Sequence, residues 1–253
     1  MSSFDEVSIA YDSSVDWAAR LNKEMPFLLK CLPVSRRPRV LDMACGSGRH
    51  AVALAQKGAD VIGLDSSISM ISAARSLAEK EGVNAEFLVA DMRDVEKAVK
   101  HKLDLVICLG NSLALLPTFE DVRQVIESAS LKLTPAGSFV FQVLNFEEIR
   151  KSGFRFFPTK AGIMPNGEET VFTRFFDHSA DGTTSSLVIS AFTKSGTQWS
   201  AVTSTQRVLN LNPDAIKSAL LAARFRSVDF LSDYQESPFE RATSRDLIVR
   251  ARQ

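Results

Sequence analysis

Short, continuous apolar runs alternate with helical patterns through the first two-thirds of this chain. The predicted strands are RVLDMA (39–44), DVIGLD (60–65), AEFLVA (85–90), LDLVICLG (103–110) and SFVFQVL (138–144). Strands that are apolar along their whole length are buried on both faces, and intervening helices cover the faces of a parallel sheet. Crossovers of this kind are right-handed. We therefore predict an α/β fold with a doubly wound, mostly parallel seven-stranded sheet, completed by two strands from FRSVDFLS and SRDLIVRA near the chain's end.

Helix signals fill the gaps between these strands. A short helix over 49–57 is stopped by Gly58, and a second over 67–81 is followed by Gly82. Thr118 and Asp121 form a capping-box pattern that starts a third helix, and a fourth covers 212–223. The segment LTPAG, before the fifth strand, is predicted to be a turn.

From about residue 154 the pattern changes to alternation of polar and apolar residues. Strands are predicted at 171–178, 184–192 and 198–211, separated by the turn signals Asp181-Gly182 and Ser195-Gly196. This antiparallel β insertion follows the fifth strand. We expect a lid-helix region at 1–36, a core of 37–147 and 212–253, and an insertion of 148–211 that serves as a lid, substrate or dimer region.

Composition narrows the class of protein. Thirty basic and thirty acidic residues balance in 253, which argues against a nucleic-acid or anionic-membrane partner. The three cysteines have no metal-binding spacing and lie in apolar contexts, so we expect reduced thiols, no metal site and a cytoplasmic location. The acidic N-terminus does not resemble a signal peptide, and no apolar run approaches the length of a membrane helix.

A glycine-bracketed turn follows the first strand, where open parallel sheets bind ligands. Gly46 and Gly48 allow a ligand to approach the backbone, and Asp65 could bind the hydroxyls of a ribose. The stretch also satisfies the dinucleotide pattern. However, the acidic Asp42 would repel a pyrophosphate, and the bulky Arg49 and His50 crowd the helix start. An adenosine cofactor carrying an ammonium group suits this turn better.

In five places these residues resemble the class I S-adenosylmethionine-dependent methyltransferases. VLDMACGSGRH, VIGLD, VADMRDV, LDLVICLGNSL and LTPAGSFVFQV resemble successive motifs of that family over about residues 38–145. The chain's end and the insertion resemble its small-molecule subgroup, which includes enzymes like glycine N-methyltransferase and amino-sugar N-methyltransferases. Ala44 departs from the family, in which most members have glycine. The resemblance implies a cofactor site formed by Tyr11, Asp42, Ala44, Gly46, Arg49, Asp65, Ser66, Met70, Asp91, Met92, Leu109, Gly110 and Asn111.

The resemblance also implies individual roles. Asp91 would receive the adenine amino group, with the backbone of Met92 beside the ring, while Tyr11 could close over the cofactor. Tyr11 and Asn111 are the candidate catalytic residues. The same side chains have structural interpretations as well: Asp65 and Asp91 could cap helices, and Asn111 could end a strand.

Other residues have two interpretations each. Arg49 could be a surface charge or a cofactor contact, and His50 is expected to be a packed or capping side chain. A role in the substrate chamber and ordinary packing are both open for five residues, Trp17, Arg174, Phe176, Trp199 and Tyr234.

The expected activity is methyl transfer from S-adenosylmethionine to a small molecule. No convincing general base accompanies the motifs, which favours an amine nitrogen as acceptor. The alternatives are O-methylation of a small metabolite, an NAD-dependent oxidoreductase and a cofactor-binding protein without turnover. A homodimer through the insertion is a further expectation.

Overall fold

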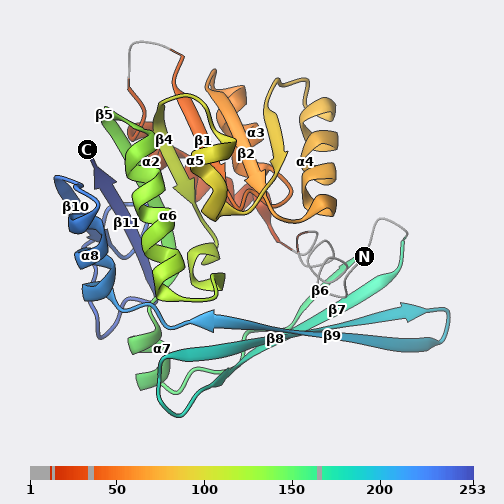
Figure 1. The fold of residues 1–253 in the computed structure, drawn as a ribbon. Helices are drawn as coiled ribbons and strands as arrows, with labels where there is room; N and C mark the ends of the chain where they lie inside the picture. The colour runs from red at the N-terminus through yellow and green to blue at the C-terminus, as the bar shows by residue number, and fades with distance from the viewer. Residues whose placement is uncertain (1–11, 13–14, 34–36, 164–166) are drawn as a thin grey trace.

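The computed structural model describes residues 12, 15–33, 37–163 and 167–253. Two sheets divide the chain (Figure 1). Seven strands form the larger sheet, in the order β10-β11-β5-β4-β1-β2-β3, and four strands form the smaller one, in the order β6-β7-β8-β9. Among the described residues, no helix is both long and apolar enough to cross a membrane.

The larger sheet is parallel from β3 to β5. Its strands are β1 (Arg39–Met43), β2 (Asp60–Asp65), β3 (Glu86–Val89), β4 (Leu103–Cys108), β5 (Leu133–Leu144), β10 (Ser227–Leu231) and β11 (Asp246–Arg252). Only β11 runs antiparallel, to both of its neighbours. Every residue of β4 is buried. The predicted doubly wound, mostly parallel seven-stranded sheet is confirmed.

Helices cover both faces of this sheet. One apolar cluster includes buried residues of α2 (Trp17–Lys30), α3 (Arg49–Gln56) and α4 (Ile68–Lys80). The other includes residues of α5 (Val95–Ala98), α6 (Phe119–Lys132) and α8 (Pro213–Ala222). The predicted capping box is present, since Thr118 and Asp121 satisfy each other's backbone N–H at the start of α6. Short 3-10 turns, η1 (Met92–Asp94) and η2 (Ser112–Leu115), follow β3 and β4.

The predicted turn at LTPAG is wrong. Residues 133–137 form the first part of β5, and the pairing of β5 with β4 shifts register between Leu103 and Leu105. Proline and glycine there produce an irregular strand because the backbone still pairs on either side of the shift. A short helix, α7 (Phe146–Lys151), follows β5 and was not predicted.

The insertion forms the smaller sheet, which lies beneath the larger one in Figure 1. Its strands are β6 (Lys160–Ile163), β7 (Glu169–His178), β8 (Thr184–Ser195) and β9 (Gln198–Leu209), and all of their pairings are antiparallel. Strand β6 was not predicted from the sequence. Alternation sets the two faces: Phe172 and Phe176 are buried, whereas Ile163 and Trp199 are 74% and 51% exposed.

Candidate functional site

A cavity of about 580 Å³ opens where β1, β2, β3 and β4 end. A volume of this size is typical of small-molecule sites, and the carboxyl edge of a parallel sheet is where such sites occur. Ten of the thirteen predicted cofactor residues line it, namely Asp42, Ala44, Gly46, Asp65, Ser66, Met70, Asp91, Met92, Leu109 and Gly110. The sheet topology brings these residues, scattered over about seventy positions, to one edge.

The turn after β1 is built from left-handed backbone. Ala44, Gly46 and Gly48 have φ angles of 54°, 54° and 76°. A side chain on Gly48 would lie 2.8 Å from the Ala74 Cβ, so only glycine fits between the turn and α4. A side chain on Gly46 would meet open space on the cavity side. Gly48 is therefore required by packing, while Gly46 keeps the cavity open.

Asp65 holds this turn closed. Its carboxylate accepts hydrogen bonds from the backbone N–H of Gly46 and of Ser67, both at 2.9 Å. Ser67, rather than Asp65, is the N-cap residue of α4. Asp65 thus joins the ends of β1 and β2 at the edge of the cavity.

Asp42 is buried beneath the turn, with 2% of its surface exposed. Its Oδ2 atom has no hydrogen-bond partner among the described residues. The pKa of Asp42 is raised to about 7, mainly by burial and also by the charge of Asp65, with His50 acting in the opposite direction. An unpartnered buried carboxyl oxygen is costly unless a donor reaches it. A cation in the cavity would supply that donor.

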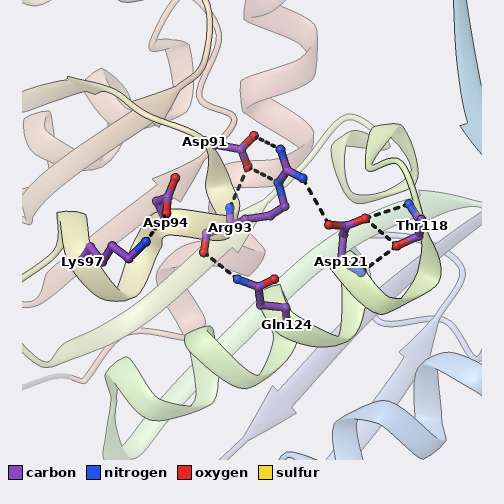
Figure 2. Close-up of polar contacts among 7 residues, drawn as sticks. All are labelled: Asp91, Arg93, Asp94, Lys97, Thr118, Asp121 and Gln124. Atoms are coloured by element: carbon purple, nitrogen blue, oxygen red, sulfur yellow. Dashed lines mark hydrogen bonds and ion pairs between the residues drawn. The ribbon is translucent and has the colours of Figure 1, made fainter.

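Asp91 is fixed by an arginine from the same segment (Figure 2). The Arg93 guanidinium donates to both carboxylate oxygens of Asp91, at 2.7 and 2.9 Å, and to Asp121 of α6 at 3.2 Å. These hydrogen bonds lower the pKa of Asp91. A carboxylate has about four acceptor positions, so this clamp orients Asp91 and leaves capacity for a ligand.

Helix α2 also contributes to the cavity wall, through Trp17 and Arg20. The Arg20 guanidinium lies 5.0 Å from the Trp17 ring centroid, and its Nε donates to Glu24 at 3.0 Å. Its Nη2 atom lies 3.6 Å from where a Cβ on Gly110 would sit. The two Nη groups have no hydrogen-bond partner among the described residues, so they can bind an anion in the cavity.

His50 is fixed by Glu24 from the same helix. The Nε2 atom of His50 lies 2.5 Å from the Glu24 Oε2, and both side chains are almost fully buried. Burial raises the pKa of Glu24, but hydrogen bonding to His50 and the charge of Arg20 outweigh it, and the net pKa is lowered. The pair attaches α2 to α3 over the glycine turn. This agrees with the packed histidine expected from the sequence, although His50 also borders the cavity.

Two predicted residues lie beside the cavity instead of lining it. The Asn111 Oδ1 accepts a hydrogen bond from the Leu144 N–H at 2.9 Å, which joins the start of η2 to the end of β5, and the neighbouring Ser112 lines the cavity. The Arg49 guanidinium lies 4.0 Å from the Asp12 carboxylate and 5.9 Å from the Trp17 ring centroid. The contacts that Asn111 and Arg49 make are with other parts of the protein, as their structural interpretations expect. Their cofactor roles stay predictions. Tyr11 lies outside the described residues.

Of the five aromatic and basic candidates for the substrate chamber, only Trp17 lines the cavity. Phe176 is part of the core, and Tyr234 packs on Phe27 with ring centroids 5.7 Å apart. Trp199 lies on the outer face of the insertion, and Arg174 lies against Phe157 on the inner face. The lining residues that sequence reasoning missed are Asp12, Arg20, Cys45, Ser47, Leu64, Ser67, Ala90, Arg93, Leu115, Leu116, Pro117 and Gln206.

The described residues contain no group of three or more histidine, cysteine or acidic side chains that could hold a metal ion. The free thiols of Cys45 and Cys108 are buried, and burial raises the pKa of each far above its usual value.

Comparison with known proteins supports the resemblance read from the sequence. Residues 40–137 match the family model described as a methyltransferase domain. The glycine/sarcosine N-methyltransferase of Aphanothece halophytica is 32% identical over 57% of this chain and 55% of its own length. The dTDP-4-amino-2,3,4,6-tetradeoxy-D-glucose N,N-dimethyltransferase of Saccharopolyspora spinosa is 26% identical over 69% of this chain and 65% of its own.

The chain thus spans about half the length of the glycine/sarcosine relative. Among solved structures, an S-adenosylmethionine-dependent methyltransferase from Clostridium acetobutylicum superimposes with a TM-score of 0.77, at 18% identity over 94% of this chain and 92% of that one. At this identity the superposition establishes the fold, which is the Rossmann-like methyltransferase fold. The resemblance to class I methyltransferases is confirmed.

Proposed function

We propose that this protein transfers a methyl group from S-adenosylmethionine to an amine nitrogen of a small molecule. The observation that carries the proposal is the buried, unpartnered Oδ2 of Asp42 beneath a glycine turn at the carboxyl edge of the sheet. A buried carboxylate disfavours a pyrophosphate and suits an ammonium group. The similarity to N-methyltransferases and the methyltransferase domain match support the same activity.

The chemistry of the cavity walls fits the cofactor part by part. Asp65 would hold the ribose hydroxyls and Asp91 the adenine amino group, while Asp42 faces the ammonium end. Arg20 offers two free Nη donors to the carboxylate of the amino-acid tail, a role that we add on the basis of the structure. Met70 and Met92 provide apolar surface for the adenine ring.

The end of the cavity near Gly110 is suited to exclude water. Its described lining includes Leu109, Leu115, Leu116 and Pro117, with the hydroxyl of Ser112 donating to the Leu109 carbonyl. When bound, the cofactor supplies a methyl group already activated by a sulfonium. The protein then has to align the acceptor and keep the site dry. None of these five lining residues is a carboxylate or imidazole, which suits an amine that needs only to lose a proton.

Two parts of the protein would enclose the transfer site. Asp12 and α2 contribute to one wall, and Gln206 of β9 contributes from the insertion. Asp12 accepts a hydrogen bond from the Ser47 hydroxyl at 2.8 Å, which links the N-terminal segment to the glycine turn. We propose that this segment and the insertion form the lid, that the outer face of the insertion supports a homodimer, and that the protein acts in the cytoplasm.

Ligand-induced thermal stabilisation tests the proposed function. S-adenosylmethionine and S-adenosylhomocysteine should each raise the melting temperature, while NAD at the same concentration should leave it unchanged. Stabilisation by NAD alone would favour an oxidoreductase. Turnover is then measured as S-adenosylhomocysteine release with matched amine and hydroxyl acceptors. Release with hydroxyl acceptors alone would favour O-methylation, and cofactor binding without release in a broad acceptor panel would support a non-catalytic role.

A further inference from the structure

A second cavity lies at the end of the insertion, where β9 reaches the start of α6 beside α7 (Figure 1). Its volume is about 660 Å³, compared with about 580 Å³ for the cavity at the carboxyl edge of the larger sheet. The two cavities share no lining residue. Both volumes are typical of small-molecule sites, and methyl transfer gives the second cavity no role.

Strand β9 separates the two cavities. Gln206 lines the first cavity and its neighbour Arg207 lines the second, because successive side chains of a strand point to opposite faces. The Arg207 Nη1 donates a hydrogen bond to the Pro117 carbonyl oxygen at 2.6 Å, and Pro117 lines the first cavity. The second cavity is therefore a separate site that adjoins the wall of the first.

Part of the second cavity is apolar. Phe146 of α7, Leu209 of β9 and the following Leu211 are buried, and Phe119 of α6 and Ala215 of α8 are half-buried. Five apolar residues from four helices and strands and one connection thus meet at one place. Such a surface favours an aromatic or aliphatic group in the ligand, because burial removes apolar area from water.

Two guanidinium groups also line this cavity. The Arg150 Nη1 donates to the Ser179 carbonyl oxygen at 3.0 Å, and Arg207 donates to Pro117 as described above. Among the described residues, neither guanidinium has a further hydrogen bond or an ion pair. The Nε and Nη2 groups of both arginines can therefore donate to a ligand.

The two acids that line the cavity differ from the arginines in already having donors. Asp181 accepts hydrogen bonds from the Ser179 hydroxyl and from the N–H and hydroxyl of Thr183, which lower the pKa of Asp181 to about 2. Glu147 accepts a hydrogen bond from the Asn212 amide at 2.8 Å. The hydrogen-bonding capacity that remains in the lining is thus mainly that of the guanidinium donors, which suits an anion.

We propose that the second cavity binds a small organic anion, with its carboxylate or phosphate on Arg150 and Arg207 and its aromatic or aliphatic body on the apolar residues. Guanidinium groups suit such anions because their planar donors match two oxygens at once. The proposal goes beyond methyl transfer and does not depend on it. It gives the protein a second ligand, bound one residue away from the wall of the methyl-transfer cavity.

Calorimetric titration with phenyl phosphate and with phenylacetate tests this site, in the presence of saturating S-adenosylhomocysteine and in its absence. We expect at least one of the two anions to bind saturably under both conditions, with a Kd of about 1 mM or lower, as the size of these ligands allows. Benzyl alcohol has the same ring without the charge and should bind at least about tenfold more weakly.

Substitution of the two arginines locates the binding. The Arg150→Gln/Arg207→Gln double variant should lose at least about tenfold in affinity, because it removes charge-assisted hydrogen bonds. The matched control is Arg226→Gln, which removes the same charge from an exposed position that lines neither cavity. Its affinity should stay within about twofold of the unmodified protein.

Three results would overturn the proposal: no saturable binding of either anion, equal affinity in the double variant, or complete loss of anion binding when S-adenosylhomocysteine is added. The last would place the anions in the first cavity. If the double variant does not fold by circular dichroism, Arg207→Gln alone decides, because this side chain is exposed. A loss of at least about threefold is expected for it, and unchanged affinity would contradict the proposal.

Discussion

The two sheets of this protein differ in how far their strands are buried. Strand β4 of the larger sheet is buried at all six positions, because helices cover both of its faces. Strand β9, at the edge of the smaller sheet, is exposed from Gln198 to Thr203. In the larger sheet, the cavity is lined by residues of the turns that follow β1, β2, β3 and β4. In the smaller sheet, we propose that the side chains of the inner face contact the acceptor.

This contrast separates two kinds of specificity. The cofactor side of the cavity depends on left-handed turns, strand ends and a few acids in fixed places. We propose that the acceptor side depends on which residues of the insertion alternate inward, such as Gln206, which lines the cavity. We expect the cofactor side to tolerate few substitutions that alter the backbone, and the acceptor side to tolerate few that alter the side chains of the insertion.

The largest expected effect on stability comes from replacing a left-handed glycine by alanine. One such glycine follows a strand of each sheet. Gly48→Ala introduces a Cβ only 2.8 Å from Ala74, in addition to the cost of the φ angle. We expect about 3 kcal/mol of lost unfolding free energy, combining backbone strain with overpacking. Gly182→Ala, with a similar φ, meets only the end of the Arg150 side chain, at 3.3 Å, and should cost about 1 kcal/mol. Urea denaturation measures both, and equal losses would contradict the contrast.

Removing an acid from the cofactor edge should affect binding more than stability. Asp65→Ala deletes the acceptor for two backbone N–H groups and the proposed ribose contact. We expect S-adenosylhomocysteine binding to weaken by roughly 1–3 kcal/mol, as loss of a charge-assisted hydrogen bond does. Asp177→Ala on the insertion removes an exposed acid paired with Arg155 and serves as the control, with unchanged affinity. An Asp65→Ala protein that binds as tightly as the unmodified one would remove its assigned role.

A substitution at Ala44, in the turn after β1, should raise stability instead of lowering it. Ala44 has a φ of 54°, which strains an L-residue and explains why most members of the resembled family have glycine there. Ala44→Gly should stabilise the fold by about 1 kcal/mol through relief of that strain, less the added entropy of the unfolded chain. Thermal denaturation compares it with Ala201→Gly, an exposed alanine on β9 that has no such strain to relieve. Destabilisation by Ala44→Gly would mean that the methyl group packs usefully.

The smallest effect is expected on the outer face of the insertion. Trp199 is 51% exposed, so Trp199→Ser should change the unfolding free energy by no more than about 0.5 kcal/mol in the monomer. In sedimentation, the same variant should weaken self-association if this face forms the proposed homodimer. Unfolding free energy lost by more than about 1 kcal/mol at concentrations where the protein is monomeric would show that the face is covered within one chain.

The elements of the larger sheet could be predicted because periodicity and caps act locally. The Thr118–Asp121 capping box and the buried strand runs needed no tertiary information. The start of β5 could not be predicted, since LTPAG reads as a turn and becomes strand only through pairing with β4. The four residues of β6 are too few to show alternation, and their pairing with β7 decides their conformation.

The site was predictable on its cofactor side for the same reason. Strand ends and glycines mark Asp42, Gly46 and Asp65 in the sequence itself. Arg20, by contrast, is one of many charged residues on an amphipathic helix, and only the packing of α2 on α3 brings it to the cavity. Asn111 shows the converse, because its side chain binds the backbone of Leu144 at the end of β5 instead of lining the cavity.

We propose that Asp42, the buried acid beneath the glycine turn, binds the ammonium end of the cofactor. Because folding raises the pKa of Asp42 from 3.8 to about 7, its ionisation costs stability as pH rises through that range, and a bound cation offsets the cost. Calorimetry of S-adenosylhomocysteine should therefore show affinity rising about tenfold from pH 6 to pH 8, with proton release near pH 7. The Asp42→Asn variant should bind more weakly and independently of pH over this interval. Binding by the unmodified protein that is flat with pH, or an Asn variant with unchanged affinity, would contradict the claim.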